Sequence, residues 1–320
     1  MKIYYKILSM LMLSIVLISC DNNDDDNDYS NPSIYELASE NESLSTLVTA
    51  LQLTGLDNTL SSQGPFTVLA PTNDAFDNFL ASVNASSLND IPTDVLTNVL
   101  LNHVISGSVM STSLSTGYAN TLATSAASGT NMSIYISTES GVSFNGVSNV
   151  MTADVTANNG VVHVVDGVIG LPSVVTFALA DPNFEVLVQA LTREDLTQDF
   201  VGLLSIPSGP PSPFSVFAPV NGAFIDLLAE LGLSGLSEID EPTLSAVLAY
   251  HVIPGANQLS INLSGGMEFS TAQGTSLLFN FSDSGTGYLT DNNERISNII
   301  AVDVQADNGI IHAIDKVVLP

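Results

Sequence analysis

The stretch PFTVLAPTNDAF, at residues 65–76, decides the fold because the chain contains it twice. It returns as PFSVFAPVNGAF at residues 213–224. A second motif, HVISG at residues 103–107, returns as HVIPG at residues 251–255 with the same offset. The sequence therefore repeats a long unit rather than one short motif.

A third motif closes the repeated unit. DVTANNGVVHVVDGVIGLP, at residues 154–172, returns as DVQADNGIIHAIDKVVLP at residues 303–320. A repeat distance of roughly 150 residues is the size of an ordinary domain, whereas solenoid repeats recur every 20–50 residues or so. We therefore predict two homologous domains in tandem, at residues 33–172 and 173–320.

The composition is strongly acidic. The chain has 33 Asp and Glu against 5 Lys and Arg, a formal net charge of −28. Only Arg193, Arg295 and Lys316 follow residue 20, and residues 33–172 contain no Lys or Arg. Nucleic-acid binding needs clustered positive charge to displace counterions, so no nucleic-acid partner is expected. The acidity favours solubility or a salty medium, with a cation-dependent contact as the alternative.

The first 19 residues have the pattern of a secretion signal. Lys2 and Lys6 precede an apolar stretch at residues 7–18, which is shorter than the roughly 20 residues that span a hydrocarbon core. The stretch ends in LISC at residues 17–20, which resembles the lipobox of bacterial lipoproteins. That resemblance implies cleavage before Cys20 and lipidation of Cys20, the only cysteine in the chain. An ordinary secretory signal with a chance cysteine is the alternative.

Residues 20–32 begin with Cys20 and continue as DNNDDDNDYSNP, which predicts an acidic, disordered tether because like charges repel and few apolar groups are present. Acids directly after the lipidated cysteine resemble an export signal that sends some Gram-negative lipoproteins to the outer face of the outer membrane. In other bacteria, an Asp next to the cysteine retains a lipoprotein at the inner membrane, and a passive spacer is a third interpretation. We expect a lipid-anchored outer-membrane protein that is exposed on the cell surface.

Each predicted domain changes its hydrophobic period from helical to alternating along its length. The predicted helices include residues 44–51 and 184–191, and residues 74–80 and 222–231. The predicted short strands are residues 67–70 and 215–218. Residues 130–138, 141–150, 274–282 and 287–300 alternate around Gly and Asn turns, as hairpin strands do. An Asn-Gly turn precedes the last strand of each domain. Helices first and strands later predict an α+β fold, in which a core of largely antiparallel strands is flanked by N-terminal helices.

These three motifs, twice in the same order, resemble those of fasciclin domains, and the resemblance covers residues 33–320. It implies a compact wedge of strands and helices and a role in adhesion or extracellular binding. The motif residues that it carries over are Pro71, Thr72, Asn73, Pro219, Asn221, Tyr250 and His251. In some animal members, the region around the Tyr-His pair is implicated in integrin binding. The first unit departs from the pattern, with Asn102 before His103.

All four histidines of the chain, His103, His163, His251 and His312, fall within the repeated motifs. Metal ligation or base catalysis is one interpretation of them. Because each lies in an apolar run, we favour a structural role, in which a partly buried imidazole is hydrogen-bonded to the backbone or to a carboxylate. Four aspartates also recur at matching places and could form paired carboxylates: Asp154, Asp166, Asp303 and Asp315. Flanking strand turns and capping explain them better than catalysis does.

Zinc-hydrolase and serine-hydrolase motifs do not occur in the sequence. We therefore predict no enzyme, no cofactor and no metal site. The favoured function is a membrane-anchored surface module that contacts glycan, matrix or a protein ligand. A periplasm-facing accessory lipoprotein of an envelope complex is the alternative, and a glycan-modifying enzyme is a third hypothesis. The short junction at Leu171–Ser173 predicts a fairly fixed orientation of the two domains.

Overall fold

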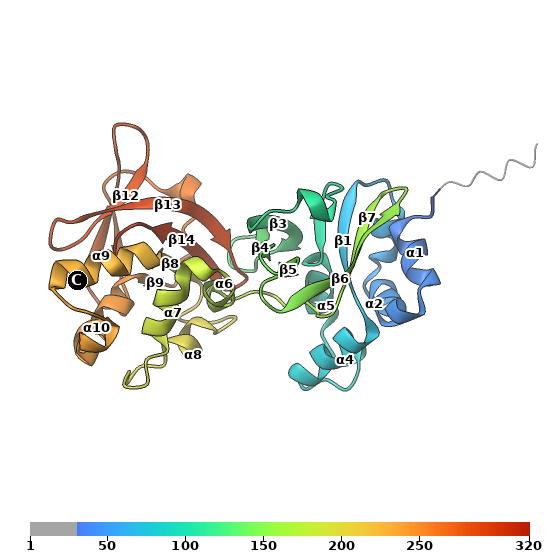
Figure 1. The fold of residues 1–320 in the computed structure, drawn as a ribbon, viewed down its shortest axis with the longest axis horizontal. Helices are drawn as coiled ribbons and strands as arrows, with labels where there is room; N and C mark the ends of the chain where they lie inside the picture. Colours follow the sequence, from blue (N-terminus) through green and yellow to red (C-terminus); the bar gives the residue numbers. More distant parts are fainter. Residues whose placement is uncertain (1–30) are drawn as a thin grey trace, which may run out of the picture. The chain divides into compact units, whose positions relative to one another are not determined.

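Two tandem α+β domains occupy residues 31–320, the part of the chain that this computed structural model describes (Figure 1). The α+β fold class with two tandem units is therefore confirmed. The predicted signal peptide at residues 1–19, the lipidation site Cys20 and residues 20–30 of the tether lie outside the described residues.

The first domain begins with helices that surround one early strand. Its helices are α1 (Ile34–Glu40), η1 (Glu42–Leu44), α2 (Ser45–Thr54), α3 (Asp57–Ser61), α4 (Asn73–Ser82), η2 (Leu88–Asp90), α5 (Thr93–Leu101) and η3 (Ser111–Ser113). Its strands are β1 (Phe66–Pro71), β2 (Val104–Ser106), β3 (Gly117–Thr124), β4 (Asn131–Ser137), β5 (Ser143–Phe144), β6 (Ser148–Ala157) and β7 (Gly160–Val165).

The second domain repeats this order of elements. Its helices are α6 (Val174–Ala180), η4 (Pro182–Phe184), α7 (Glu185–Leu191), α8 (Phe200–Leu204), α9 (Asn221–Leu231), η5 (Leu236–Glu238), α10 (Glu241–Tyr250) and η6 (Ser260–Asn262). Its strands are β8 (Phe214–Pro219), β9 (Val252–Pro254), β10 (Met267–Ser270), β11 (Ser276–Phe281), β12 (Gly287–Thr290), β13 (Ile296–Gln305) and β14 (Gly309–Ile314).

The early strand of each domain pairs with the last one. β1 runs parallel to β7 and antiparallel to β2, and β8 has the same two relationships to β14 and β9. Figure 1 shows β1 and β7 side by side, with α1 and α2 against one flank of the pair. The other strand pairs are antiparallel. The first domain closes into a barrel, whereas the second has an open sheet of order β10-β11-β12-β13-β14-β8-β9.

Two of the stretches that the sequence predicts as hairpin strands are each divided by a turn. Residues 141–150 contain β5 and the start of β6, because Asn145 and Gly146 take positive φ angles of 50° and 67° between them. Residues 287–300 contain β12 and the start of β13, separated by a loop in which Glu294 has a φ of 59°. Each stretch therefore contains parts of two antiparallel strands joined by a turn, as the alternation around Gly and Asn predicts for hairpin strands.

The glycine of each Asn-Gly pair belongs to the last strand of its domain rather than to the turn before it. In the first domain the turn residues are Asn158 and Asn159, and Gly160 already belongs to β7. A Cβ on Gly160 would lie 1.9 Å from the carbonyl oxygen of Phe66 on the neighbouring β1. Gly309 meets Phe214 in the same way, at 2.2 Å. Each glycine is therefore required by the close approach of the parallel strand.

Each domain buries its own apolar core between the helices and the sheet. In the first domain Leu47, Leu51 and Phe76 of the helices pack with Val68 and Val162 of the central strands. Among residues 31–320, no single helix is long and apolar enough to cross a membrane. Residues 174–180 and 182–191 reach that length only as a pair bent by 96°.

Candidate functional site

The Pro-X-Asn motif joins a strand to the helix that follows it. Pro71 ends β1 and Pro219 ends β8. Asn73 opens α4, and its side chain accepts a hydrogen bond from the Thr46 backbone NH at 2.9 Å and donates to the Glu42 carbonyl at 2.9 Å. Asn221 makes the equivalent pair of bonds with Val186 and Pro182, at 2.9 and 2.8 Å. Through these two hydrogen bonds, each asparagine links the start of its own helix to the start of an earlier helix.

The residue between the proline and the asparagine differs between the domains. Thr72 caps α4, since its Oγ1 accepts a hydrogen bond from the Ala75 NH at 3.3 Å. Val220 holds the same place before α9 and makes no side-chain cap. Helix α9 therefore lacks the side-chain N-cap that its counterpart α4 has.

His103 and His251 join the end of a helix to the end of their own domain. Nδ1 of His103 donates to the Val99 carbonyl at 2.8 Å, and its Nε2 accepts from the Ile169 NH at 2.9 Å. His251 repeats both contacts with Val247 at 2.7 Å and Val318 at 3.1 Å. Burial lowers the pKa of each imidazole to about 4, against a smaller opposing effect of the bond to the helix carbonyl.

His163 and His312 use the opposite ring tautomer. Nδ1 of His163 accepts from the Asp154 NH at 3.1 Å, and its Nε2 donates to the Val109 carbonyl at 3.0 Å. His312 accepts from the Asp303 NH at 3.4 Å and donates to the Gln258 carbonyl at 2.8 Å. Burial also lowers the pKa of His312. Both nitrogens of all four imidazoles are thus engaged by the backbone.

Asp154 and Asp303 hold a bulge in the long strand before each of these histidines. Their φ angles are 63° and 60°, and their carboxylates accept from the NH and hydroxyl of Ser111 and Ser260, respectively. Bonds from Ser111 lower the pKa of Asp154. Because each aspartate fixes its local backbone, the carboxylates act as structural groups of the strand.

Asp166 and Asp315 each bind one asparagine across the sheet. Asp166 accepts from the backbone NH of Asn149 at 2.6 Å and from its amide at 3.0 Å. Asp315 accepts from the same two groups of Asn298, at 2.7 and 2.8 Å. The predicted motif residues therefore lie in separate local contacts, and the structure does not gather them into one site.

Tyr250 ends α10 and is fully buried. Its hydroxyl donates to the Ser276 carbonyl at 2.7 Å, and burial raises its pKa to about 12. The Tyr-His pair is thus enclosed in the core of the second domain, whereas in the first domain Asn102 donates to the Gly170 carbonyl at 3.0 Å. Within residues 31–320, no group of three or more His, Cys, Asp or Glu side chains is placed to hold a metal ion.

Sequence reasoning missed the structural role of two asparagines. Asn159 accepts from the Ile34 NH at 2.9 Å, and its amide donates to the carbonyls of Leu60 and Ser62. Asn308 makes the corresponding three bonds in the second domain. Both are visible in the sequence as turn residues, but their long-range contacts leave no local signal.

Sequence reasoning also missed a contact between the domains. Tyr118 on β3 and Tyr135 on β4 are cross-strand partners in the first domain, with ring centroids 5.1 Å apart. Tyr135 belongs to the buried core cluster of the second domain, and Tyr118 packs against that cluster. The Tyr118 ring lies 5.6 Å from that of Phe177, and its hydroxyl donates to Asp181 at 3.0 Å. Burial raises the pKa of both tyrosines.

Polar bonds accompany the tyrosine contact. The Gln305 NH donates to the Ser133 hydroxyl at 3.0 Å, and its buried amide donates to the Ser125 hydroxyl at 3.1 Å. The Ala126 NH donates to the Asp307 carboxylate at 3.1 Å. The two domains are therefore joined by packed rings and directed hydrogen bonds as well as by their short linker.

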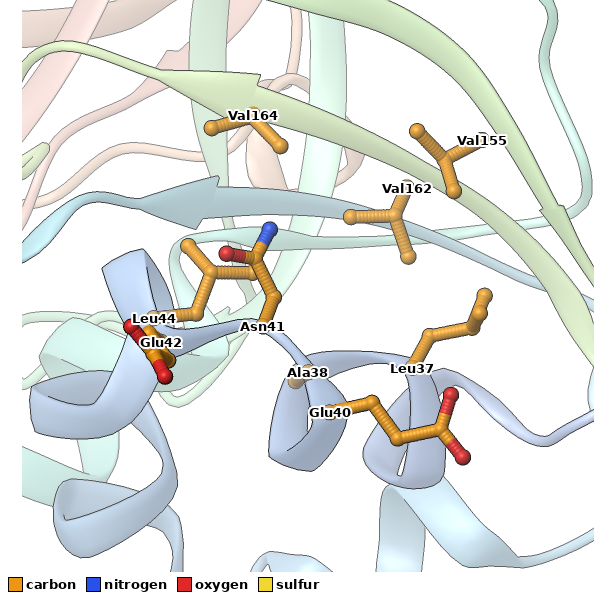
Figure 2. A pocket seen from close by; sticks show the side chains of 9 residues that line it. All are labelled: Leu37, Ala38, Glu40, Asn41, Glu42, Leu44, Val155, Val162 and Val164. Carbon is orange, nitrogen blue, oxygen red and sulfur yellow. The ribbon is translucent and has the colours of Figure 1, made fainter.

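The first domain has an open pocket between its first helices and its sheet (Figure 2). The cavity has a volume of about 330 Å³, with Val155, Val162 and Val164 on the sheet side. The helical side is formed by Leu37, Ala38, Glu40, Asn41, Glu42 and Leu44. Figure 2 shows the Asn41 side chain directed into the space below the valines, with the two glutamates at the rim.

The chain matches the fasciclin domain family over residues 42–172 and 182–320, and it therefore belongs to that family. Over 148 residues it is 38% identical to Protein sll1483 of Synechocystis sp., a match that covers 46% of this chain and 73% of the relative. It is 28% identical to the pig transforming growth factor-beta-induced protein ig-h3 over 82% of this chain, but spans only 35% of that protein.

A solved structure shares the two-domain fold. It is a fasciclin domain pair from the insect cell adhesion molecule fasciclin I, which is 20% identical and covers 87% of this chain and 97% of its own. The TM-score is 0.52. Fasciclin domains are in general adhesion or binding modules rather than enzymes, which agrees with the prediction from the motifs.

Proposed function

We propose that this protein is a membrane-anchored lipoprotein that acts in adhesion or binding at the cell surface through its two fasciclin domains. Its ligand is an extracellular glycan, a matrix component or another protein. Family membership and the fold shared with an insect cell adhesion molecule support this proposal. Both domains would engage their ligands through exposed surfaces, as binding modules on a stable scaffold do.

The observation that carries the proposal is that the histidines of the repeated motifs already use both ring nitrogens in hydrogen bonds within the fold. His103, His163, His251 and His312 each bond the backbone through both ring nitrogens. Burial also lowers the pKa of three of these four, so that they stay neutral at pH 7. A general base must reach a substrate proton, whereas the ring nitrogens of these imidazoles are hydrogen-bonded to the backbone inside the fold.

Anchoring rests on the sequence around Cys20. Several acyl chains on one cysteine would hold the protein firmly, since each buried methylene contributes about 0.8 kcal/mol. The acidic residues after Cys20 would extend the tether by mutual repulsion and favour export to the outer surface. Two domains on one tether raise the effective concentration of two weak binding sites.

A second candidate is a periplasm-facing accessory lipoprotein of an envelope complex. The observation that favours it is Asp21, directly after Cys20, because an Asp at that position retains lipoproteins at the inner membrane in some bacteria. This candidate predicts protection of both domains from outside and co-purification with a fixed partner.

The experiment that separates the two candidates is protease shaving of intact cells, with antibodies against each domain and against a periplasmic control protein. Loss of both domains with the control protein intact supports surface adhesion. Protection of both domains supports the periplasmic candidate and ends the adhesion proposal. A Cys20→Ser variant provides the matched control, since it should release the protein from the membrane fraction if Cys20 carries the lipid.

A further inference from the structure

The pocket of the first domain has a structural counterpart in the second domain. Leu37 and Phe177 are each the fourth residue of the first helix in their domain. Asn41 and Asp181 each end that helix and cap the 3-10 helix that follows. The sheet side corresponds as well: Val155 pairs with Val162, and Val304 pairs with Ile311. We call these two places the first and second sockets.

The second socket is filled by the tyrosines of the first domain. Tyr135 is buried with Phe177, Val304 and Ile311, with only 2% of its surface exposed. Tyr118 lies edge-on to Phe177 and donates to Asp181. The socket therefore binds an aromatic pair presented by two neighbouring strands and gives the phenol a hydrogen-bond partner.

The first socket has apolar residues at the corresponding wall positions and no occupant among residues 31–320 (Figure 2). Its volume of about 330 Å³ is at the lower end of the range for small-molecule pockets, about 300–1,000 Å³. Asn41 takes the place of Asp181, and its Oδ1 accepts from the NH and hydroxyl of Ser43. Its amide nitrogen can then donate to a phenol oxygen, whereas Asp181 accepts from one.

The rim of the first socket is charged where that of the second is apolar. Glu40 and Glu42 are exposed at the rim, and the corresponding residues of the second socket are Ala180 and Pro182. The first domain contains no Lys or Arg that could neutralise these carboxylates. A partner with positive charge beside its aromatic ring would therefore be attracted and oriented by the rim.

We propose that the first socket is a docking site for another protein that presents a tyrosine from a β-hairpin, with Lys or Arg beside it. This inference deepens the proposed binding function by naming one surface and the chemistry of its partner. It rests on the proposed function only for the location at which the partner protein binds, the cell surface. The internal precedent is the second socket, which already binds a hairpin tyrosine pair in this same geometry.

A second copy of this chain does not meet the requirement. Its tyrosine pair already fills its own second socket. Its basic side chains in residues 31–320 are in ion pairs: Arg193 with Asp195, Arg295 with Glu230 and Asp291, and Lys316 with Glu230. A copy would therefore bring further negative charge to a negative rim.

The test is methyl NMR of the purified protein, titrated with acetyl-Lys-Tyr-Lys-amide. Ring currents from a bound tyrosine should shift the methyl signals of Val155, Val162 and Val164 saturably, with a Kd of about 1 mM, as expected for so small a ligand. Replacing Tyr with Ala in the peptide, or both Lys residues with Glu, should weaken binding by about tenfold or more.

Two protein variants provide matched controls for the rim and the cavity. Glu40→Gln with Glu42→Gln should weaken Lys-Tyr-Lys binding by about threefold or more and remove the difference between the Lys and Glu peptides. Asp77→Asn with Asp226→Asn makes the same change in net charge at exposed sites elsewhere and should leave the affinity unchanged. Leu37→Trp should block the cavity, because the second domain already accepts the aromatic Phe177 at this position.

Three outcomes would overturn the proposal. The first is linear, unsaturated shifts of methyl groups across both domains, which indicate nonspecific contact. The second is an equal loss of affinity in both double variants. The third is a socket that is already occupied without peptide, by a second copy of the chain or by Tyr29 of the predicted tether. Its signs are socket methyl shifts that depend on protein concentration, or that change when Tyr29 is replaced by Ala. Binding here is measured on purified protein, so its failure is separate from the location tested by shaving.

Discussion

The two sockets show how repeated domains acquire different surfaces. Both domains keep the strand-proline-asparagine motif, the two histidine contacts and the parallel pairing of their first and last strands. They differ at the pocket between the first helix and the sheet. In the second domain this pocket is filled by Tyr118 and Tyr135 of the first domain, whereas in the first domain it is open. The repeated residues therefore stabilise the fold that the domains share, and the residues that differ determine which groups bind in each socket.

The largest expected effect follows from emptying the second socket. Tyr135→Ala removes a buried ring from the core cluster of the second domain. We expect the free energy of unfolding of that domain to fall by about 3 kcal/mol, the usual cost of deleting a buried aromatic side chain. Thermal or urea unfolding would measure this loss, and small-angle scattering should show a wider range of domain orientations.

The control for that variant is Tyr288→Ala on β12, where the ring is only partly buried. It should cost less than half as much and leave the scattering curve unchanged. If Tyr135→Ala leaves both the stability and the scattering curve as they are in the unmodified protein, the contact between the domains does not hold them together.

A second prediction concerns the acid sensitivity of the two domains. Burial lowers the folded-state pKa of His103 in the first domain and of His251 and His312 in the second. An unfolded histidine takes up its proton near pH 6.5, so the unfolded state binds more protons below that pH. The stability from these neutral imidazoles is therefore present above pH 6.5 and is lost as the pH falls toward 4.

Each such histidine contributes a slope of up to about 1.4 kcal/mol per pH unit. The urea midpoint of the second domain, which contains His251 and His312, should therefore fall as the pH is lowered from 7 to 5. Replacement by His251→Gln should lower stability at pH 7 and make the remaining slope shallower by about one proton. A slope that stays the same in His251→Gln would contradict this assignment.

The sequence predicts the repeated parts of the fold well because their causes are local. The Pro65–Phe76 stretch contains a strand, its terminating proline and the start of the next helix, and all three occur as expected. The exact positions of the turns within residues 141–150 and 287–300 were not predicted, since left-handed Asn145 and Glu294 lie inside alternating, strand-like patterns. The sequence pattern also did not predict that the first domain closes into a barrel while the second does not. In the structure β3 spans eight residues, whereas its counterpart β10 spans four.

The sockets could not be found from the repeat because the tyrosines are not repeated. Tyr135 and Asn280 each stand five residues after the Thr of a shared Gly-Thr pair, and the Asn280 side chain accepts from the Gly266 NH within its own domain. Which surface a side chain of β4 contacts depends on the arrangement of whole domains, which no local period encodes. A difference between repeats is thus the sequence signal to examine, although it identifies neither the partner nor the pocket.

The smallest predicted effect exchanges the caps of two equivalent helices. Thr72→Val removes the hydroxyl that caps α4 and should lower the stability of the first domain by about 1 kcal/mol, while Val220→Thr should stabilise the second by up to a similar amount. Differential scanning calorimetry of the two single variants and the double variant measures both changes. Because the caps lie in different domains, the two effects should add within about 0.5 kcal/mol. A shift of the wrong domain's transition by either substitution would mean that the domains unfold as one unit through the tyrosine contact.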